Sequence, residues 1–264
     1  MRVAAYQAPL TIARSLDVVD SIRLQVRRCE SAGAIVLCCP EAILGGLADY
    51  HQRPSEIAIE AGRLKTVLAP LASQTVTTIV GFTELGEGGQ IFNSAAVFQR
   101  GEVAGVYRKL YPAIRRSVYS PGREVPVFHI GELTFGIAIC NDSNYRELAR
   151  FMAGQGATAL FVPTNNGLPS KRAYAGLVAE ARECDIANSV ENRMWVIRAD
   201  VAGSTGELVS YGSTEIVDPD GVVVQYARQM VEDLVIADID TARRPHRRGG
   251  EQSRKCGWSR QRSC

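Results

Sequence analysis

The chain has 264 residues, 46% of them hydrophobic, and a formal net charge of +2. This length and composition are typical of one large α/β domain, and no apolar stretch reaches the roughly 18 residues that a membrane-spanning helix needs. The N-terminus reads as a strand rather than a signal peptide, and the seven cysteines contain no CxxC pair. We therefore expect a cytoplasmic protein with reduced thiols and no disulfide framework.

Apolar periodicity predicts strands and helices in the first half of the chain. The first helix is indicated by apolar residues at spacings of three and four: Leu16, Val19, Ile22, Val26 and Cys29. Gly33 is expected to end this helix, and the glycine-rich turn 86–89 to join a hairpin. The other predicted elements are strands at 2–8 and 34–39, a helix from about 56 to 73, and strands at 76–82, 92–98 and 102–108.

The second half of the chain continues the alternation. The predicted elements are strands at 125–130 and 133–139, a helix from Tyr145 to Met152, a strand at 157–162, a helix from about 172 to 191, and strands at 194–200, 211–217, 221–227 and 231–239. Asn144 is expected to cap the helix that follows it, with Glu147 three residues further on. Strands 34–39 and 133–139 lack polar alternation, which predicts that both of their faces are buried.

Cys140 stands where α/β proteins often place their chemistry. It ends the apolar run 133–139 and precedes the polar turn 141–144, after which a helix is predicted. Backbone amides and the positive end of a helix dipole favour thiolate there, so we expect the pKa of Cys140 to lie below the usual value of about 8.5. The ordinary alternative is a small core residue, as we expect for Cys38 and Cys39.

Two other ionisable residues also follow predicted strands. Glu41 comes after strand 34–39, and Lys109 comes after strand 102–108. If these strands lie beside the strand before Cys140, the three groups converge at one edge of a sheet. Glu41 would then take the thiol proton, and Lys109 with the backbone N–H of Asn141 would hold an oxyanion. Taken singly, Glu41 also fits a loop carboxylate and Lys109 a surface charge.

Each of the three residues lies in a distinctive local sequence. These sequences are Cys-Pro-Glu-Ala-Ile-Leu-Gly-Gly, Val-Tyr-Arg-Lys-Leu-Tyr-Pro and Phe-Gly-Ile-Ala-Ile-Cys-Asn-Asp. In this order and spacing they resemble the carbon–nitrogen hydrolase (nitrilase) superfamily, and the resemblance covers residues 2–239. It implies that Glu41 is the base, Lys109 the oxyanion ligand and Cys140 the nucleophile. It also implies a four-layer α-β-β-α sandwich that associates into homodimers or larger homo-oligomers.

The loop after Lys109 departs from the family pattern. Many members carry a second glutamate there, whereas the nearest corresponding residue in this chain is Arg115. A guanidinium cannot accept a proton, so either the substrate is positioned differently or a glutamate elsewhere, such as Glu124, takes that place. Arg115 is a candidate for pairing with a substrate carboxylate, and a structural ion pair is the alternative.

Substrate recognition is expected to depend on loops. Asn165 and Asn166 stand where many relatives have a small residue and then an aromatic. The Asn166 amide is a candidate for binding a polar substrate, and a simple turn is the alternative. Tyr50, His51 and Arg172 are further candidates. The chain has three histidines and no phosphate-binding glycine loop, so we expect neither a metal nor a cofactor.

The C-terminal segment differs in composition from the rest of the chain. Residues 241–264 carry eight Lys or Arg and one Glu, which leaves 22 basic and 27 acidic residues, a net charge of −5, over residues 1–240. We predict a carbon–nitrogen hydrolase domain at 1–240 and a basic tail at 241–264 that is too poor in apolar residues to order. We do not expect this tail to bind nucleic acid.

These features predict an enzyme that cleaves a C–N bond in a small molecule through a thioester. The substrate is an amide, an ω-amide or an N-carbamoyl compound, and the sequence does not choose among them. A nitrilase acting on a nitrile is the enzymatic alternative. A non-catalytic member that serves as a binding or assembly module is the other alternative, which the departure at Arg115 keeps open.

Overall fold

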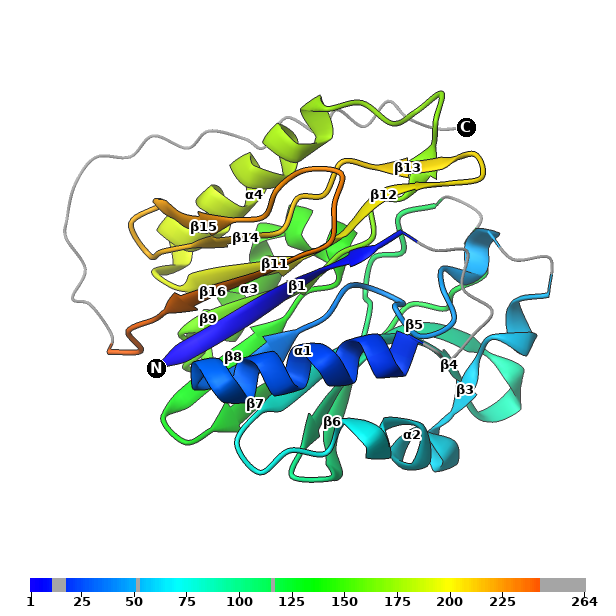
Figure 1. Cartoon of the computed structure of the whole chain (residues 1–264), viewed down its shortest axis with the longest axis horizontal. Coiled ribbons are helices and arrows are strands. Elements are labelled where there is room, and N and C mark those ends of the chain that lie inside the picture. The colour runs from blue at the N-terminus through cyan, green and yellow to red at the C-terminus, as the bar shows by residue number, and fades with distance from the viewer. Residues whose placement is uncertain (11–17, 51–52, 115–116, 243–264) are drawn as a thin grey trace.

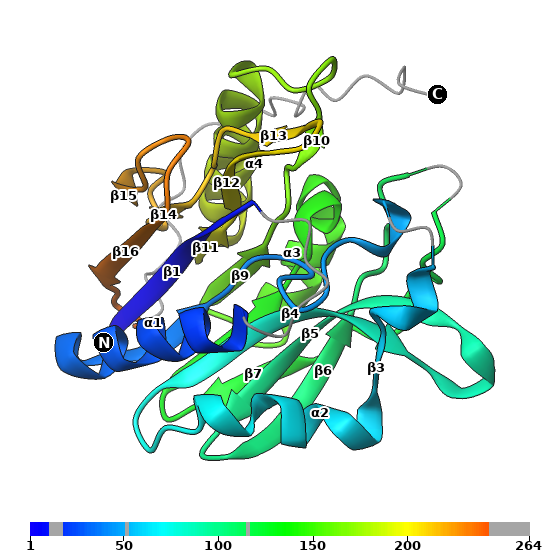
Figure 2. The same ribbon diagram turned by 45° about the vertical axis from the view of Figure 1, so that its right-hand side comes forward.

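Two β-sheets face one another, and helices cover their outer faces (Figures 1 and 2). The computed structural model describes residues 1–10, 18–50, 53–114 and 117–242. Helices α1 (Val18–Ala32) and α2 (Ala61–Leu68) pack on the first sheet, and α3 (Arg146–Gly154) and α4 (Gly176–Asn192) on the second. The predicted four-layer α-β-β-α sandwich is therefore confirmed.

The first sheet has ten strands in the described part of the chain. Its main path runs β10-β13-β12-β1-β2-β4-β5-β6, with β16 paired to β1 and β3 paired to β4. The strands are β1 (Arg2–Pro9), β2 (Ala34–Cys38), β3 (Ile59–Glu60), β4 (Thr77–Leu85), β5 (Ile91–Gln99), β6 (Glu102–Arg108), β10 (Leu168–Pro169), β12 (Val201–Thr205), β13 (Leu208–Ser210) and β16 (Asp233–Asp238). Because β1, β2 and β4 are parallel, their carboxyl ends meet at one edge.

The second sheet has six strands among the described residues, in the order β15-β14-β11-β9-β8-β7. They are β7 (Val127–Ile130), β8 (Leu133–Ile137), β9 (Ala159–Pro163), β11 (Trp195–Ala199), β14 (Glu215–Val217) and β15 (Val223–Tyr226). Strands β8, β9 and β11 are parallel, so they also end at a common edge. Polar residues that follow these strands can thus meet those that follow the first sheet.

The alternation of side chains along each strand fills two separate layers of core. On β1, Val3 and Ala5 face the second sheet, whereas Ala4 and Tyr6 pack under the helices. Strands β2 and β8 are buried almost throughout, as their unbroken apolar sequences predicted. The sheets are therefore central layers.

The predicted helix at 56–73 is too long. Only Ala61–Leu68 is α-helical, because Ile59–Glu60 pairs with β4 as a short edge strand before the helix begins. Beyond Leu68 the chain tightens into a 3-10 turn that contains Pro70, whose ring removes a helical N–H donor. The short strands β10, β12 and β13 were not predicted.

The expected cap at Asn144 is also wrong. Helix α3 begins at Arg146 with Tyr145 as its N-cap residue. Residues Cys140–Asn144 form a 3-10 stretch instead, and the Asn144 amide donates to Asn141 Oδ1 at 3.0 Å. Leu16 and residues 243–264 of the tail lie outside the described residues.

Gly81 on β4 lies against the segment that carries Glu41. A Cβ atom at Gly81 would stand 2.4 Å from the Pro40 carbonyl oxygen and 2.8 Å from Glu41 Cα. We expect Gly81→Ala to lower the free energy of unfolding by about 1–3 kcal/mol, because backbone must shift to admit the methyl group. Urea denaturation measures the change.

Gly62→Ala is the matched control for this prediction. Gly62 lies in α2 with no atom within 4 Å of its ideal Cβ position. Alanine there should raise the free energy of unfolding by about 0.5–1 kcal/mol. A Gly81→Ala variant as stable as Gly62→Ala would contradict the close approach at β4.

Candidate active site

The three predicted site residues follow strands of two different sheets. Glu41 follows β2 and Lys109 follows β6 in the first sheet, whereas Cys140 follows β8 in the second. The expectation that three neighbouring strands of one sheet bring them together is therefore wrong. Cys140 lies near the other two residues because the two sheets pack face to face. All three side chains line one cavity.

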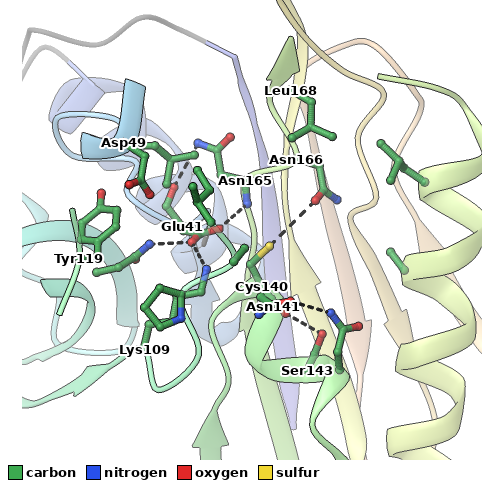
Figure 3. A pocket seen from close by; sticks show the side chains of 18 of the residues that line it. Glu41, Asp49, Lys109, Tyr119, Cys140, Asn141, Ser143, Asn165, Asn166 and Leu168 are labelled. Carbon is green, nitrogen blue, oxygen red and sulfur yellow. Dashed lines mark hydrogen bonds and ion pairs between the residues drawn. The ribbon is translucent and has the colours of Figure 1, made fainter. Parts of the chain in front are cut away.

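This cavity has a volume of about 170 Å³. That volume equals roughly five or six water molecules at about 30 Å³ each, which suits a small molecule. In Figure 3, Glu41 and Lys109 lie on one side of the Cys140 sulfur and Asn166 lies on the other. The wall also contains apolar residues from four segments: Leu47, Pro112, Ala113, Ile114, Leu168, Leu177 and Ala181.

Glu41 and Lys109 form a buried ion pair. Lys109 Nζ donates to Glu41 Oε1 at 2.6 Å, and the two side chains are only 4% and 2% exposed. Asn93 Nδ2 donates to the same oxygen at 2.7 Å, and the Asn165 N–H donates to Oε2 at 3.0 Å. A carboxylate has about four acceptor positions, so these three bonds leave room for one further proton donor.

The ion pair also sets the charge of the lysine. Burial works to lower the pKa of Lys109, but the negative charges around it, of which Glu41 is the strongest, together outweigh burial and the pKa is raised. Lys109 therefore remains an ammonium inside the cavity.

Cys140 occupies a strained turn. Its φ is +47°, a left-handed conformation that costs a residue with a side chain about 1–3 kcal/mol. Two buried side chains hold the turn. Ser143 Oγ donates to the Cys140 carbonyl oxygen at 2.8 Å. Asp142 Oδ2 accepts the Ile139 N–H at 3.1 Å and the Tyr107 hydroxyl at 2.7 Å.

The pKa of Cys140 moves in the direction opposite to the one predicted. Burial raises it to about 12, the Glu41 carboxylate adds to the rise, and Lys109 and Arg198 oppose it. The prediction failed because α3 starts only at Arg146, so no α-helix N-terminus adjoins the thiol. Cys140 is therefore a thiol at neutral pH, and it needs a base when it attacks a carbon.

A second buried ion pair supports the Cys140 turn. Arg198 on β11 and Asp185 on α4 share two hydrogen bonds of 2.6 Å, and both are almost completely buried. Arg198 also donates to Thr164 Oγ1 at 2.8 Å and to Ser143 Oγ at 3.2 Å. Since Ser143 bonds Cys140, one side chain links the ion pair to the turn.

Two of the three predicted polar ligands, Asn141 and Asn166, line the cavity. The Asn141 side chain is engaged, because its Nδ2 donates to the Tyr111 carbonyl oxygen at 2.9 Å. Its backbone N–H lies in the first turn of the 3-10 stretch, where helical donors lack a partner within the helix. Asn166 Oδ1 lies 4.0 Å from Cys140 Sγ.

The remaining candidates divide into three groups. Arg115 and His51 lie outside the described residues. Tyr50 lines the cavity, and Arg172 is not among its lining residues. Glu124 lines a separate surface depression beside Arg108, so the suggestion that it replaces the second glutamate is wrong.

Several residues that shape the cavity were not predicted. Asp49 is the other carboxylate among its described lining residues, and it accepts the Ser117 hydroxyl at 3.0 Å and the Val118 N–H at 2.9 Å. Arg198 and Asp200 are charged residues at the end of a buried apolar strand. Such a position is costly without a partner, and that signal was available in the sequence.

Within the described residues, no group of three or more His, Cys, Asp or Glu side chains is arranged to hold a metal ion. No helix in that part of the chain is long and apolar enough to cross a membrane.

Comparison with known proteins agrees with the fold. The chain matches the carbon–nitrogen hydrolase family over residues 2–247 and belongs to it. It is 30% identical over 247 residues to a Pseudomonas protegens protein named "Hydrolase in pqqF 5′region", covering 91% of this chain and 83% of that protein. It is 29% identical over 220 residues to a nitrilase of Pyrococcus abyssi, covering 81% and 80%. An amidase of the nitrilase superfamily from Nesterenkonia has a similar fold, with a TM-score of 0.74, 23% identity and 90% coverage of both chains.

Removal of the partner of Arg198 should destabilise the protein strongly. We expect Asp185→Ala to lower the free energy of unfolding by about 3–5 kcal/mol, because a buried guanidinium would lose its counter-charge. Asp238→Ala is the control, since it removes a surface ion pair with Arg2 and should leave the melting temperature nearly unchanged. Circular dichroism melts measure both. Equal melting temperatures would show that the Arg198–Asp185 pair has no such role.

Proposed function

We propose that this carbon–nitrogen hydrolase is a thiol amidohydrolase that acts on a small amide-type substrate. The observation that supports this most is the buried Lys109–Glu41 pair, at 2.6 Å, in the same small cavity as the Cys140 thiol. Burial costs several kcal/mol for each ion, so a structural role alone would be served better by apolar residues.

In the first step of the proposed reaction, Cys140 Sγ attacks the carbonyl carbon and Glu41 accepts the thiol proton. The raised pKa of Cys140 makes this proton transfer necessary. Lys109 Nζ and the Asn141 backbone N–H stabilise the oxyanion. The C–N bond then breaks, Glu41 returns the proton to the leaving nitrogen, and a thioester remains on Cys140.

In the second step, water takes the place of the departed amine. Glu41 accepts a proton from the water, the oxygen adds to the thioester carbon, and the C–S bond breaks. The proton then returns to the Cys140 sulfur. Asn93 and Asn165 hold the Glu41 carboxylate in one orientation for both steps.

A nitrilase is the second candidate, because one of the similar proteins bears that name. A nitrile would react with the same thiol, but the product of the attack is a thioimidate whose carbon keeps its nitrogen. An amidase therefore releases ammonia from an amide, whereas a nitrilase releases it from a nitrile.

We expect the protein to release ammonia from small primary amides and to leave the matching nitriles unchanged. Cys140→Ala should abolish the release, and Glu41→Gln should lower kcat/KM by about 10²–10⁴-fold through loss of the base. Cys29→Ala is the control, because Cys29 lies on the buried face of α1 and is not among the residues that line the cavity. An ammonia assay with amide and nitrile pairs decides; release from the nitriles alone would identify a nitrilase.

Selective alkylation separates an enzyme from a non-catalytic binding module. We expect iodoacetamide to label Cys140, which is partly exposed, much faster than Cys38, Cys39 and Cys184, which are buried. Burial raises the pKa of Cys38 and Cys39 as it raises that of Cys140, but Cys140 shares its cavity with the Glu41 carboxylate, which can accept its proton. Peptide mass spectrometry measures the rates, with urea-unfolded protein as the control. Equal, slow labelling of all four thiols in the folded protein would favour the binding module.

A further inference from the structure

Asn166 presents its carbonyl oxygen to the Cys140 thiol. Its Oδ1 lies 4.0 Å from Cys140 Sγ, and its amide nitrogen points away from the sulfur. Nδ2 donates to Asp200 Oδ2 at 3.1 Å and to Ser213 Oγ at 3.3 Å, so both amide hydrogens have acceptors. The Asn166 backbone N–H donates to Asp200 Oδ1 at 3.0 Å. The residue is thus held at two points.

Asp200 imposes this orientation. It is 0% exposed, and its carboxylate also accepts the Val201 N–H at 2.8 Å, the Ser213 N–H at 3.0 Å and the Ser213 hydroxyl at 2.7 Å. A carboxylate surrounded by donors accepts hydrogen bonds and cannot donate them. A flipped Asn166 amide would therefore set oxygen against oxygen and leave buried polar groups unpaired, at a cost of about 1–3 kcal/mol for each.

The Cys140 sulfur lies between Asn166 Oδ1 on one side and Glu41 with Lys109 on the other (Figure 3). In the proposed reaction the leaving nitrogen lies on the Glu41 side, since it receives its proton there. The substituent that stays on the reacting carbon therefore extends toward Asn166 Oδ1.

We propose that Asn166 determines specificity by accepting a hydrogen bond from an N–H attached directly to the reacting carbon. Asp200 and Ser213 are the residues that position it. This inference rests on the proposed function and makes ureido compounds, R–NH–CO–NH₂, the preferred substrates. A carboxamide places a CH₂ group at that point, and a nitrile has no N–H at all. Either would leave Asn166 Oδ1 without a donor in the complex, so the site discriminates against ligands that lack the N–H.

The reaction balances with water as the co-reactant. Cys140 Sγ adds to the carbamoyl carbon, the C–NH₂ bond breaks, and ammonia leaves with the thiol proton. The S-carbamoyl enzyme is then hydrolysed to R–NH–COOH, and the thiol is regenerated. The carbamic acid loses carbon dioxide and gives the amine R–NH₂.

Propylurea and pentanamide test the inference, because they differ only by NH or CH₂ beside the reacting carbon. We expect the wild-type protein to release ammonia from both compounds, with the higher kcat/KM for propylurea. Asn166→Leu, which keeps the shape and removes the acceptor, should lower kcat/KM for propylurea about tenfold more than for pentanamide. Asp200→Asn, which lets the Asn166 amide rotate, should shift the same ratio in the same direction.

The controls separate specificity from stability. Asp238→Asn is a matched acid-to-amide change on the surface and should leave both rate constants unaltered. If Asp200→Asn does not fold, Ser213→Ala takes its place, since it removes one of the two acceptors of Asn166 Nδ2. Melting curves show which variants are folded.

The possible outcomes are distinct. A fall in the propylurea-to-pentanamide ratio in the Asn166 and Asp200 variants supports the inference. An equal loss for both compounds, or a wild-type protein that hydrolyses pentanamide and not propylurea, overturns it and leaves the proposed amidohydrolase intact. Ammonia release from neither compound overturns the proposed function and the inference together.

Discussion

The buried ion pair between Glu41 and Lys109 is the interaction on which the rest of the cavity depends. Neither charge is tolerable in this environment without the other, so the ends of β2 and β6 must meet although two strands lie between them. The two intervening strands, β4 and β5, allow the ends of β2 and β6 to meet. Gly81 on β4 admits the Glu41 backbone, and Asn93 on β5 bonds Glu41 with its amide and the Lys109 N–H with its carbonyl. A charge requirement thus fixes the geometry of the first sheet at this edge.

The second sheet contributes a constraint of a different kind. The backbone at Cys140 is strained, and the thiol resists ionisation because it is buried beside a carboxylate. Asp142, which accepts the Ile139 N–H, and Ser143, which donates to the Cys140 carbonyl oxygen, offset the strain, and Arg198 holds Ser143 in turn. The result is a fixed but protonated sulfur. In the proposed mechanism its reactivity therefore depends on Glu41, which couples a residue of one sheet to a residue of the other.

The sequence predicted most of the longer strands, and it singled out three residues that line one cavity, because both rest on local signals. Apolar runs define β2 and β8, and ionisable residues directly after strands define Glu41, Lys109 and Cys140. The pKa of Cys140 was predicted wrongly because no α-helix N-terminus adjoins the thiol and because its burial comes from packing between the sheets. Asp200 was not predicted as a partner of Asn166, since that contact depends on β9 lying beside β11. Long-range structure was the missing information in both cases: packing between sheets for Cys140, and pairing of strands for Asp200.

The Glu41 side and the Asn166 side of the Cys140 sulfur differ in how strongly they can select a substrate. In the proposed reaction, the Glu41 side holds first the leaving nitrogen and then a water molecule, so its groups must serve two different ligands. The retained substituent stays on the Asn166 side through both steps, and a contact made there contributes to both transition states. Asn165 bonds Glu41 and Asn166 bonds Asp200, so adjacent residues of one loop set the distance between the two sides. A neutral acceptor that takes no part in proton transfer, such as Asn166 Oδ1, is therefore the group best suited to discriminate between substrates.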